Sequence, residues 1–274
     1  MRMSPWLLVL ALATGCRAPA TAVTASSPAC VLGEATEVIP VEDPRPGELN
    51  EFFDLPDSPA WWAPAPMDAE RERYRAALLA RLGEEGLRQR ALMERQHALH
   101  TALVGKPIQR EAENSGRVLA GDTGQQSPAS CLEWRLLQRQ GRRFPLLEHP
   151  TELGAYLLRG HGRLRVYLSG MGSAGGPLRH QVRDRVVRDV KDGFEPVAHL
   201  HNHPFMFDRV PGDRLYTTED TRADIGGALA PSLTDVQAWR GMREHFGLRA
   251  GWLTNGLDSL HYPAEDFALL SAWE

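Results

Sequence analysis

The sequence lacks an excess of positive charge. Its 31 lysines and arginines are opposed by 35 aspartates and glutamates, which gives a formal net charge of −4. This balance argues against a protein that binds nucleic acid through bulk charge, so we expect no nucleic-acid partner. The chain also lacks internal repeats and, after its first 16 residues, any stretch apolar enough to cross a membrane. A hydrophobic content of 42% is ordinary for a globular protein.

The one apolar run is short and lies at the N-terminus, in MRMSPWLLVLALATGC. Arg2 precedes the run, and small residues follow it directly before Cys16. The segment resembles the lipobox of bacterial lipoprotein signal peptides, although Ala13 stands where that box usually has leucine. The resemblance implies a signal peptide over 1–15 and a lipid on Cys16. The protein would then be anchored to a bacterial envelope membrane, on its periplasmic or extracellular side. A plain secretory signal is the alternative.

Cysteine is scarce, with only three in the chain. If Cys16 carries a lipid, Cys30 and Cys131 remain, and an oxidising envelope compartment favours a disulfide between them. Two independent thiols are the alternative.

Composition divides the rest of the chain into three parts. Residues 16–66 are rich in Ala, Pro, Ser and Thr, which predicts a tether with little regular structure. Residues 67–125 are predicted to form a helical accessory region and a loop. Its apolar stripe over 68–103 is broken at Gly83 and Gly86, and 105–130 has the composition of a loop. Residues 126–274 are predicted to be the main domain.

Strand and helix patterns alternate in this last part, which predicts an α/β or α+β fold. We expect two strands over 151–170, a helix that Gly193 closes, and a strand that Pro204 ends. A helix with Ser232 as its N-cap should follow, and then a hairpin that turns at Asn255-Gly256.

Three histidines alternate in the predicted strand that Pro204 ends: His199, His201 and His203. Alternate residues of a strand share one face, so two of these imidazoles can reach one zinc ion. Exposed or hydrogen-bonded histidines without a metal are the alternative.

Two further groups are candidates for the same site. Asp235 in PSLTD is an allowed zinc ligand, and the hydroxyl of Ser232 can stabilise an oxyanion. The same Ser-x-x-Asp pattern is also that of a helix cap. Glu152, upstream in TELGAYLLRG, suits the general base of a metallohydrolase, and the alternative is an ordinary surface glutamate.

Taken together, these motifs resemble a known family. Glu152-x-Gly154-x-x-Leu157, His201-x-His203-Pro204 and Ser232-x-x-Asp235 are similar, in type and order, to the JAMM (MPN, or JAB-domain) zinc metalloprotease motif, and closest to its bacterial RadC-like branch. The resemblance covers about 149–262 and implies a mixed sheet flanked by helices. It also implies Zn²⁺ bound by His201, His203 and Asp235, with Glu152 as acid/base and Ser232 as oxyanion donor. His199 has no counterpart and is expected to be structural.

One departure from the family pattern is the long segment 204–231, which separates the second histidine from Ser232. We expect it to be an insertion that could act as a substrate-binding flap.

The leading functional prediction is therefore a membrane-anchored zinc peptidase or isopeptidase that acts on a peptide or protein. The alternative is a catalytically inactive JAMM-like binding or scaffold lipoprotein. A metal-dependent amidohydrolase barrel is excluded, because only 71 residues follow His203. The letters HNH carry little weight as a sign of a nuclease.

Overall fold

The computed structural model describes residues 30–172, 179–207 and 226–273. The predicted signal peptide and Cys16 lie outside these residues. The described chain is an α+β structure in which helices surround one mixed sheet, and this confirms the predicted fold class. Within the described residues, no helix combines the length and the apolar character that a membrane span needs.

The sheet has eight strands in the order β1-β2-β5-β4-β6-β7-β8-β3. All neighbours are antiparallel except β6 and β7, which run parallel. The strands are β1 (Glu37–Val38), β2 (Leu49–Pro56), β3 (Gln125–Pro128), β4 (Leu153–Gly160), β5 (Arg163–Gly170), β6 (Glu195–Asn202), β7 (Ala250–Thr254) and β8 (Asp258–Pro263).

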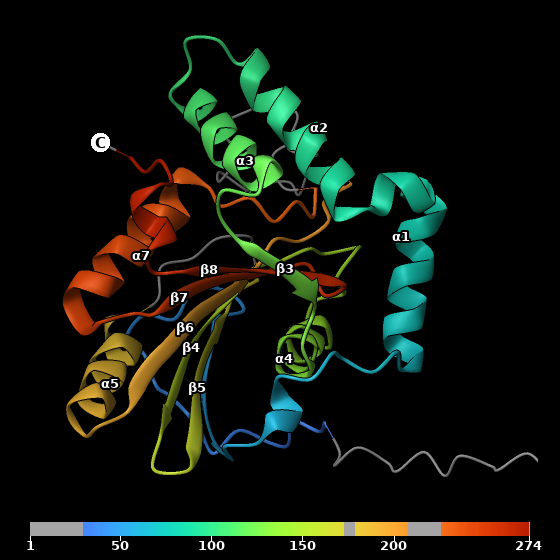
Figure 1. Cartoon of the computed structure of the whole chain (residues 1–274). Coiled ribbons are helices and arrows are strands. Elements are labelled where there is room, and N and C mark those ends of the chain that lie inside the picture. The colour runs from blue at the N-terminus through green and yellow to red at the C-terminus, as the bar shows by residue number, and fades with distance from the viewer. Residues whose placement is uncertain (1–29, 173–178, 208–225, 274) are drawn as a thin grey trace, which may run out of the picture.

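The helices cover both faces of this sheet and one of its ends. They are α1 (Ala69–Leu87), α2 (Gln89–Ala102), α3 (Glu111–Ala120), α4 (Cys131–Gly141), α5 (His180–Lys191) and α7 (Leu233–Phe246), with short 3₁₀ turns at Pro59–Trp61, Pro107–Arg110 and Asp266–Ala268. Figure 1 shows α5 and α7 on one side of the sheet and α4 on the other, with α2 and α3 together at one end.

Local patterns account for the second half of the chain. Strands β4 and β5 form the predicted hairpin, and α5 buries Val182 and Val186 of its apolar stripe. Helix α7 begins after Ser232, whose hydroxyl accepts from the backbone N–H of Asp235. The β7–β8 hairpin turns at Asn255-Gly256, as predicted, and Gly256 has a φ of 87° that favours glycine.

The predicted tether is wrong for its described part. Strand β2 pairs with β5 along its whole length, from Leu49 opposite Gly170 to Pro56 opposite Arg163. Phe53 is fully buried in the core against α4, beneath the guanidinium of Arg139. Most prolines of 16–66 lie on either side of LNEFFDLP. The average composition therefore gave no sign of this strand, although it has the apolar residues Phe52 and Phe53 at its centre.

The predicted loop over 105–130 is also wrong. It contains α3, closed by Gly121 in the left-handed conformation, and β3, which pairs with β8 at the edge of the sheet. Polar residues dominate both elements because α3 is short and β3 is an edge strand, exposed at three of its four residues. Strand β3 begins at Gln125, so the predicted domain boundary between 125 and 126 falls at the start of a strand of the main sheet.

The helical region over 68–103 forms two helices, as predicted, and Gly83 is the non-helical point inside α1 with a φ of 69°. It is not a separate accessory unit. The Arg71 guanidinium donates to the carbonyls of Gly256 and Leu257, and the hydroxyl of Tyr74 donates to the carbonyl of Asn255. Helix α1 is therefore attached to the β7–β8 turn by buried hydrogen bonds.

Cys30 and Cys131 are joined in a disulfide, the pairing predicted from the cysteine count, with their Cα atoms 6.0 Å apart. The bond ties the start of the described chain to the first residue of α4. The Arg135 Nε atom also donates to the carbonyl of Cys30, at 2.7 Å.

We expect the Cys30→Ser, Cys131→Ser double variant to lose about 2–5 kcal/mol of unfolding free energy, because the disulfide closes a long loop in the unfolded chain. Urea unfolding of the variant and the oxidised wild type would measure the difference. Peptide mapping without reductant should recover the linked pair. Two freely alkylated thiols in protein purified from an oxidising compartment would contradict the prediction.

Candidate metal centre

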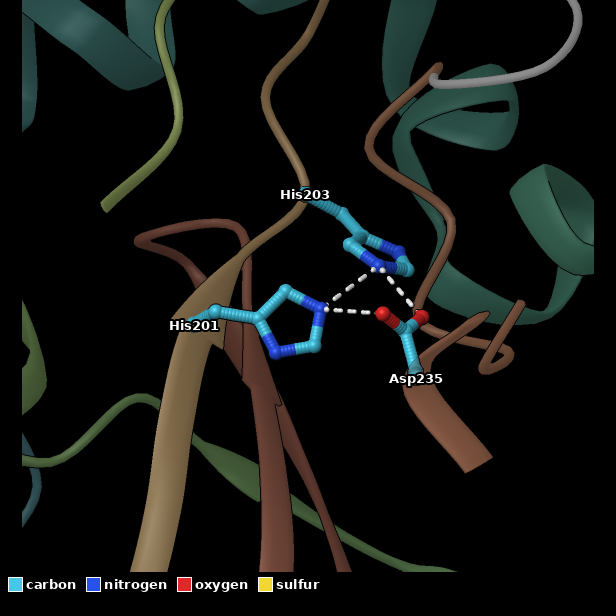
Figure 2. Close-up of side chains that lie close together, drawn as sticks. All are labelled: His201, His203 and Asp235. Carbon is cyan, nitrogen blue, oxygen red and sulfur yellow. Dashed lines mark hydrogen bonds and ion pairs between the residues drawn. The ribbon is translucent and has the colours of Figure 1, made fainter. Parts of the chain in front are cut away.

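His201 and His203 lie at the end of β6, and Asp235 lies in the first turn of α7. The strand brings both imidazoles to one face, and α7 begins beside them. The Nε2 atoms of the two histidines are 3.2 Å apart. The Asp235 carboxylate faces the Nε2 atoms of both rings, with Oδ1 3.1 Å from His201 Nε2 and Oδ2 3.4 Å from His203 Nε2 (Figure 2).

These three side chains form a group that could hold a metal ion. Two imidazole nitrogens and one carboxylate oxygen, with all ligand atoms within 4.8 Å of one another, match a three-ligand zinc site that keeps its fourth position open. His203 Nδ1 lies 2.7 Å from the carbonyl oxygen of Ala228. If Nδ1 carries the proton and donates it there, Nε2 is left deprotonated, which is the form that binds a metal.

Electrostatics tie the cluster together. Burial opposes ionisation of the Asp235 carboxyl, but the adjacent His201 and His203 imidazoles lower its pKa well below the usual range. Burial also opposes protonation of His203, but Asp235 outweighs it and raises the pKa of that imidazole. Asp235 and His203 each favour the charged form of the other, so an ionised carboxylate is available beside the two imidazoles.

Asp235 has a second role at the start of α7. Its Oδ2 accepts from the backbone N–H of Ser232 at 2.7 Å, and Ser232 Oγ accepts from the N–H of Asp235 at 3.1 Å. The helix-cap interpretation of Ser-x-x-Asp is therefore correct, and it coexists with the contacts to the histidines. The cap holds the Asp235 carboxylate in one orientation, facing the two imidazoles.

Glu152 immediately precedes β4, and β4 is the strand that pairs with β6. The last pair of the β4–β6 ladder is Gly154 with His201, two residues before His203. Together with Asp235, the charge of Glu152 raises the pKa of His203, so Glu152 lies near that imidazole. Glu152, Ser232 and the three candidate ligands line a single cavity of about 950 Å³. The structure thus brings together all five predicted site residues.

His199 is buried behind the cluster. Its Nδ1 accepts from the indole N–H of Trp239 at 3.3 Å, and its ring packs against Tyr156. Burial, and then the neighbouring His201, lower the pKa of His199 to about 3. His199 therefore favours its neutral form and packs beside the candidate ligands.

The two ends of the segment 204–231 lie close together. Phe205 pairs with Gly226 in an isolated bridge, and the N–H of Gly227 donates to the carbonyl of Pro204. The described residues on either side of 208–225 are thus joined to each other directly after His203. Residues 208–225, the body of the predicted flap, lie outside the described residues.

Several residues that support the site were missed from the sequence. Glu111 of α3 accepts from the N–H of Leu233 through Oε1, and Asn114 donates to the carbonyl of Pro231. The region predicted as accessory thus supports the start of α7. Both are single polar side chains on α3, which the polar composition of 105–130 had suggested to be a loop. No motif or spacing in the sequence marks them.

The chain matches no family model. No curated protein and no solved structure is significantly similar to it either. The functional conclusion therefore depends on the geometry of the site and on the motif resemblance.

Proposed function

We propose that the protein is a zinc-dependent peptidase or isopeptidase of the JAMM type. The observation that carries the proposal is the convergence of His201, His203 and Asp235, beside Glu152 and Ser232, in one cavity. The donor set favours zinc, because imidazole nitrogen is a good ligand for Zn²⁺. Magnesium and calcium prefer oxygen ligands, and two of the three donors here are nitrogens. Zinc, when bound, would polarise the scissile carbonyl and lower the pKa of a water molecule.

The side chains of the chain would then divide the remaining work. Glu152 accepts a proton from the attacking water and delivers it to the leaving nitrogen, as a general base and then a general acid. The hydroxyl of Ser232 accepts from the N–H of Asp235, so its own hydrogen remains to be donated to the oxyanion. Asp235 holds this serine through the reciprocal cap while it binds the metal.

The cavity suits a peptide segment. Its volume of about 950 Å³ lies at the upper end of the range of ligand sites. Aromatic side chains of the sheet and of α7 line it, among them Tyr156, Trp239 and Phe246, and Arg45 and Arg183 lie on its wall. A substrate with apolar and polar groups along an extended backbone would match this lining.

The second candidate, an inactive scaffold lipoprotein of the same fold, would have no need of a complete catalytic set. Retention of both histidines, Asp235, Glu152 and Ser232 around one cavity favours the enzyme.

The test is the metal content of the purified chain together with hydrolysis. We expect about one zinc per chain by elemental analysis, and cleavage of at least one substrate in a screen of peptides and isopeptide-linked peptides. A chelator should abolish cleavage, and added zinc should restore it. A chain that binds no zinc at micromolar concentrations would overturn the proposal, and one that binds zinc without cleaving any substrate would favour the scaffold.

The proposed location is a bacterial envelope membrane, through a lipid on Cys16. Cys16→Ala should leave an uncleaved precursor or release the protein from the membrane fraction, because the lipid supplies most of the membrane affinity. Fractionation and the mass of the mature N-terminus measure this. Normal processing with unchanged membrane association would show that a plain signal peptide, and some other anchor, operate instead.

A further inference from the structure

The ladder between β4 and β6 stops just short of the site. Its last pair is Gly154 with His201. Beyond it, the N–H of Leu153 is bonded to the side chain of Asn202 in place of a backbone carbonyl. Past this point β6 continues its pairing with β7, its neighbour on the other side, and the N–H of His203 donates to the carbonyl of Thr254. The backbone beside Glu152 therefore lies where regular strand pairing has ended.

The side chain of Asn202 takes over the hydrogen bonds at this point. Its Oδ1 accepts from the N–H of Leu153 at 2.7 Å, and its Nδ2 donates to the carbonyl of Thr151 at 3.0 Å. These backbone groups belong to the two residues that flank Glu152. Asn202 is 1% exposed, so both bonds are shielded from water.

Asn202 reaches this backbone from the face of the sheet opposite the metal centre. Side chains alternate along a strand, so Asn202 projects to the face opposite His201, and Figure 1 shows α4 on the side of the sheet away from α7. There, Gln140 of α4 donates from Nε2 to Thr151 Oγ1 and to the carbonyl of Met171, each at 2.8 Å. A buried amide network thus connects the Glu152 backbone to a helix of the core.

We propose that Asn202 is a positioning residue that holds Glu152 at its place in the cavity of the candidate metal centre. The inference rests on the proposed function, in which Glu152 transfers the proton. Asn202 links the two halves of the site because it is the residue between the histidines and is also bonded on both sides of the base. A small displacement of a catalytic group lowers the rate strongly, so loss of this clamp should act on the chemical step.

Hydrogen exchange tests the clamp without any substrate. In the zinc-loaded full mature chain, Asn202→Ala should accelerate exchange of the Leu153 amide by about tenfold or more, because that N–H loses its buried acceptor. Asn202→Asp keeps the acceptor and loses the donor to Thr151, so it should preserve most of the protection at Leu153. It also serves as the second variant if Asn202→Ala folds poorly.

Asn114→Ala is the matched control. Asn114 is likewise fully buried, with its amide bonded to the backbone of Pro231 and Ser271. Its loss should leave exchange at Leu153 unchanged.

A double-mutant cycle tests the role in catalysis. Asn202→Ala should lower kcat by about 10- to 100-fold with little change in KM or zinc content. In the Glu152→Gln background the same change should lower the residual rate by less than about threefold, because the base through which Asn202 acts is gone. Asn114→Ala should have the same effect in both backgrounds.

The outcomes separate this inference from the proposed function. Unchanged exchange at Leu153 in Asn202→Ala overturns the inference whatever the activity. Equal losses of kcat in both backgrounds, or a parallel loss of zinc, overturn it too, because Asn202 would then act on the fold or on the histidines. Wild-type chain that holds zinc without hydrolysing any substrate overturns the proposed peptidase, while the exchange measurement still decides whether Asn202 holds Glu152.

Discussion

Glu152→Gln is expected to keep zinc at the wild-type stoichiometry and to lose about 100-fold or more of its turnover. Glutamine has nearly the same shape as glutamate, and Glu152 is not among the three candidate ligands. The amide cannot accept the proton of the attacking water, so the site stays assembled while proton transfer fails. Zinc by elemental analysis and kcat must be measured on the same samples, on the best substrate found with the wild type.

The controls for this prediction are other glutamates. Glu148 and Glu195 are the near alternatives by sequence, and Glu195 lies at the opposite end of β6, paired with Arg249. Glu48 lines the cavity, but its hydrogen bond with Arg179 lowers its pKa to about 2, which makes it a poor base. Glu195→Gln should therefore turn over normally. Normal turnover by Glu152→Gln would place the base elsewhere.

Removal of a ligand should have the other large effect. His203→Ala and Asp235→Ala are each expected to lose stoichiometric zinc, and turnover with it, because each removes a bond to the metal. Asp235→Ala should also lose about 1 kcal/mol of stability, since the carboxylate caps α7 through the N–H of Ser232.

Ser232→Ala separates these two roles of Asp235. It removes the reciprocal cap hydrogen bond but no candidate ligand, so it should lose a similar amount of stability and still bind zinc. Elemental analysis after dialysis gives the zinc content, and the rise in Tm on addition of zinc gives an independent measure. If both His203→Ala and Asp235→Ala kept one zinc per chain, the metal assignment would be wrong. Ser232-x-x-Asp235 would then be a helix cap alone.

Much of the second half of the fold could be predicted because its signals are local. The apolar runs of β4 and β5, the four-residue repeat of α5, and the cap before α7 each lie within one element. The same holds for the metal ligands, since His201 and His203 are neighbours on one strand face. Local spacing thus predicted two of the three candidate ligands, His201 and His203.

Pairing between distant segments could not be predicted in the same way. Strand β2 is stabilised by its bonds to β5, more than 100 residues later, and composition alone gave no sign of that partner. Strand β3 likewise belongs to the sheet through β8. A short strand has no hydrogen-bonding partner within its own segment, so its presence depends on the neighbour that the fold supplies.

The sequence by itself determined which side chains could form the centre: two histidines on one strand face, a capping aspartate, a serine and an upstream glutamate. Only the tertiary structure decided that they meet. The pairing of β4 with β6 brings Glu152 near His201, 49 positions later in the sequence. The start of α7 beside β6 brings Asp235 to the histidines across the 204–231 segment. The tertiary structure also decided that Asn202 is bonded to the backbone on both sides of Glu152 and that Glu111 of α3 accepts from the start of α7. Hydrogen bonds between distant segments leave no periodic trace in a sequence, and those bonds set the geometry of this site.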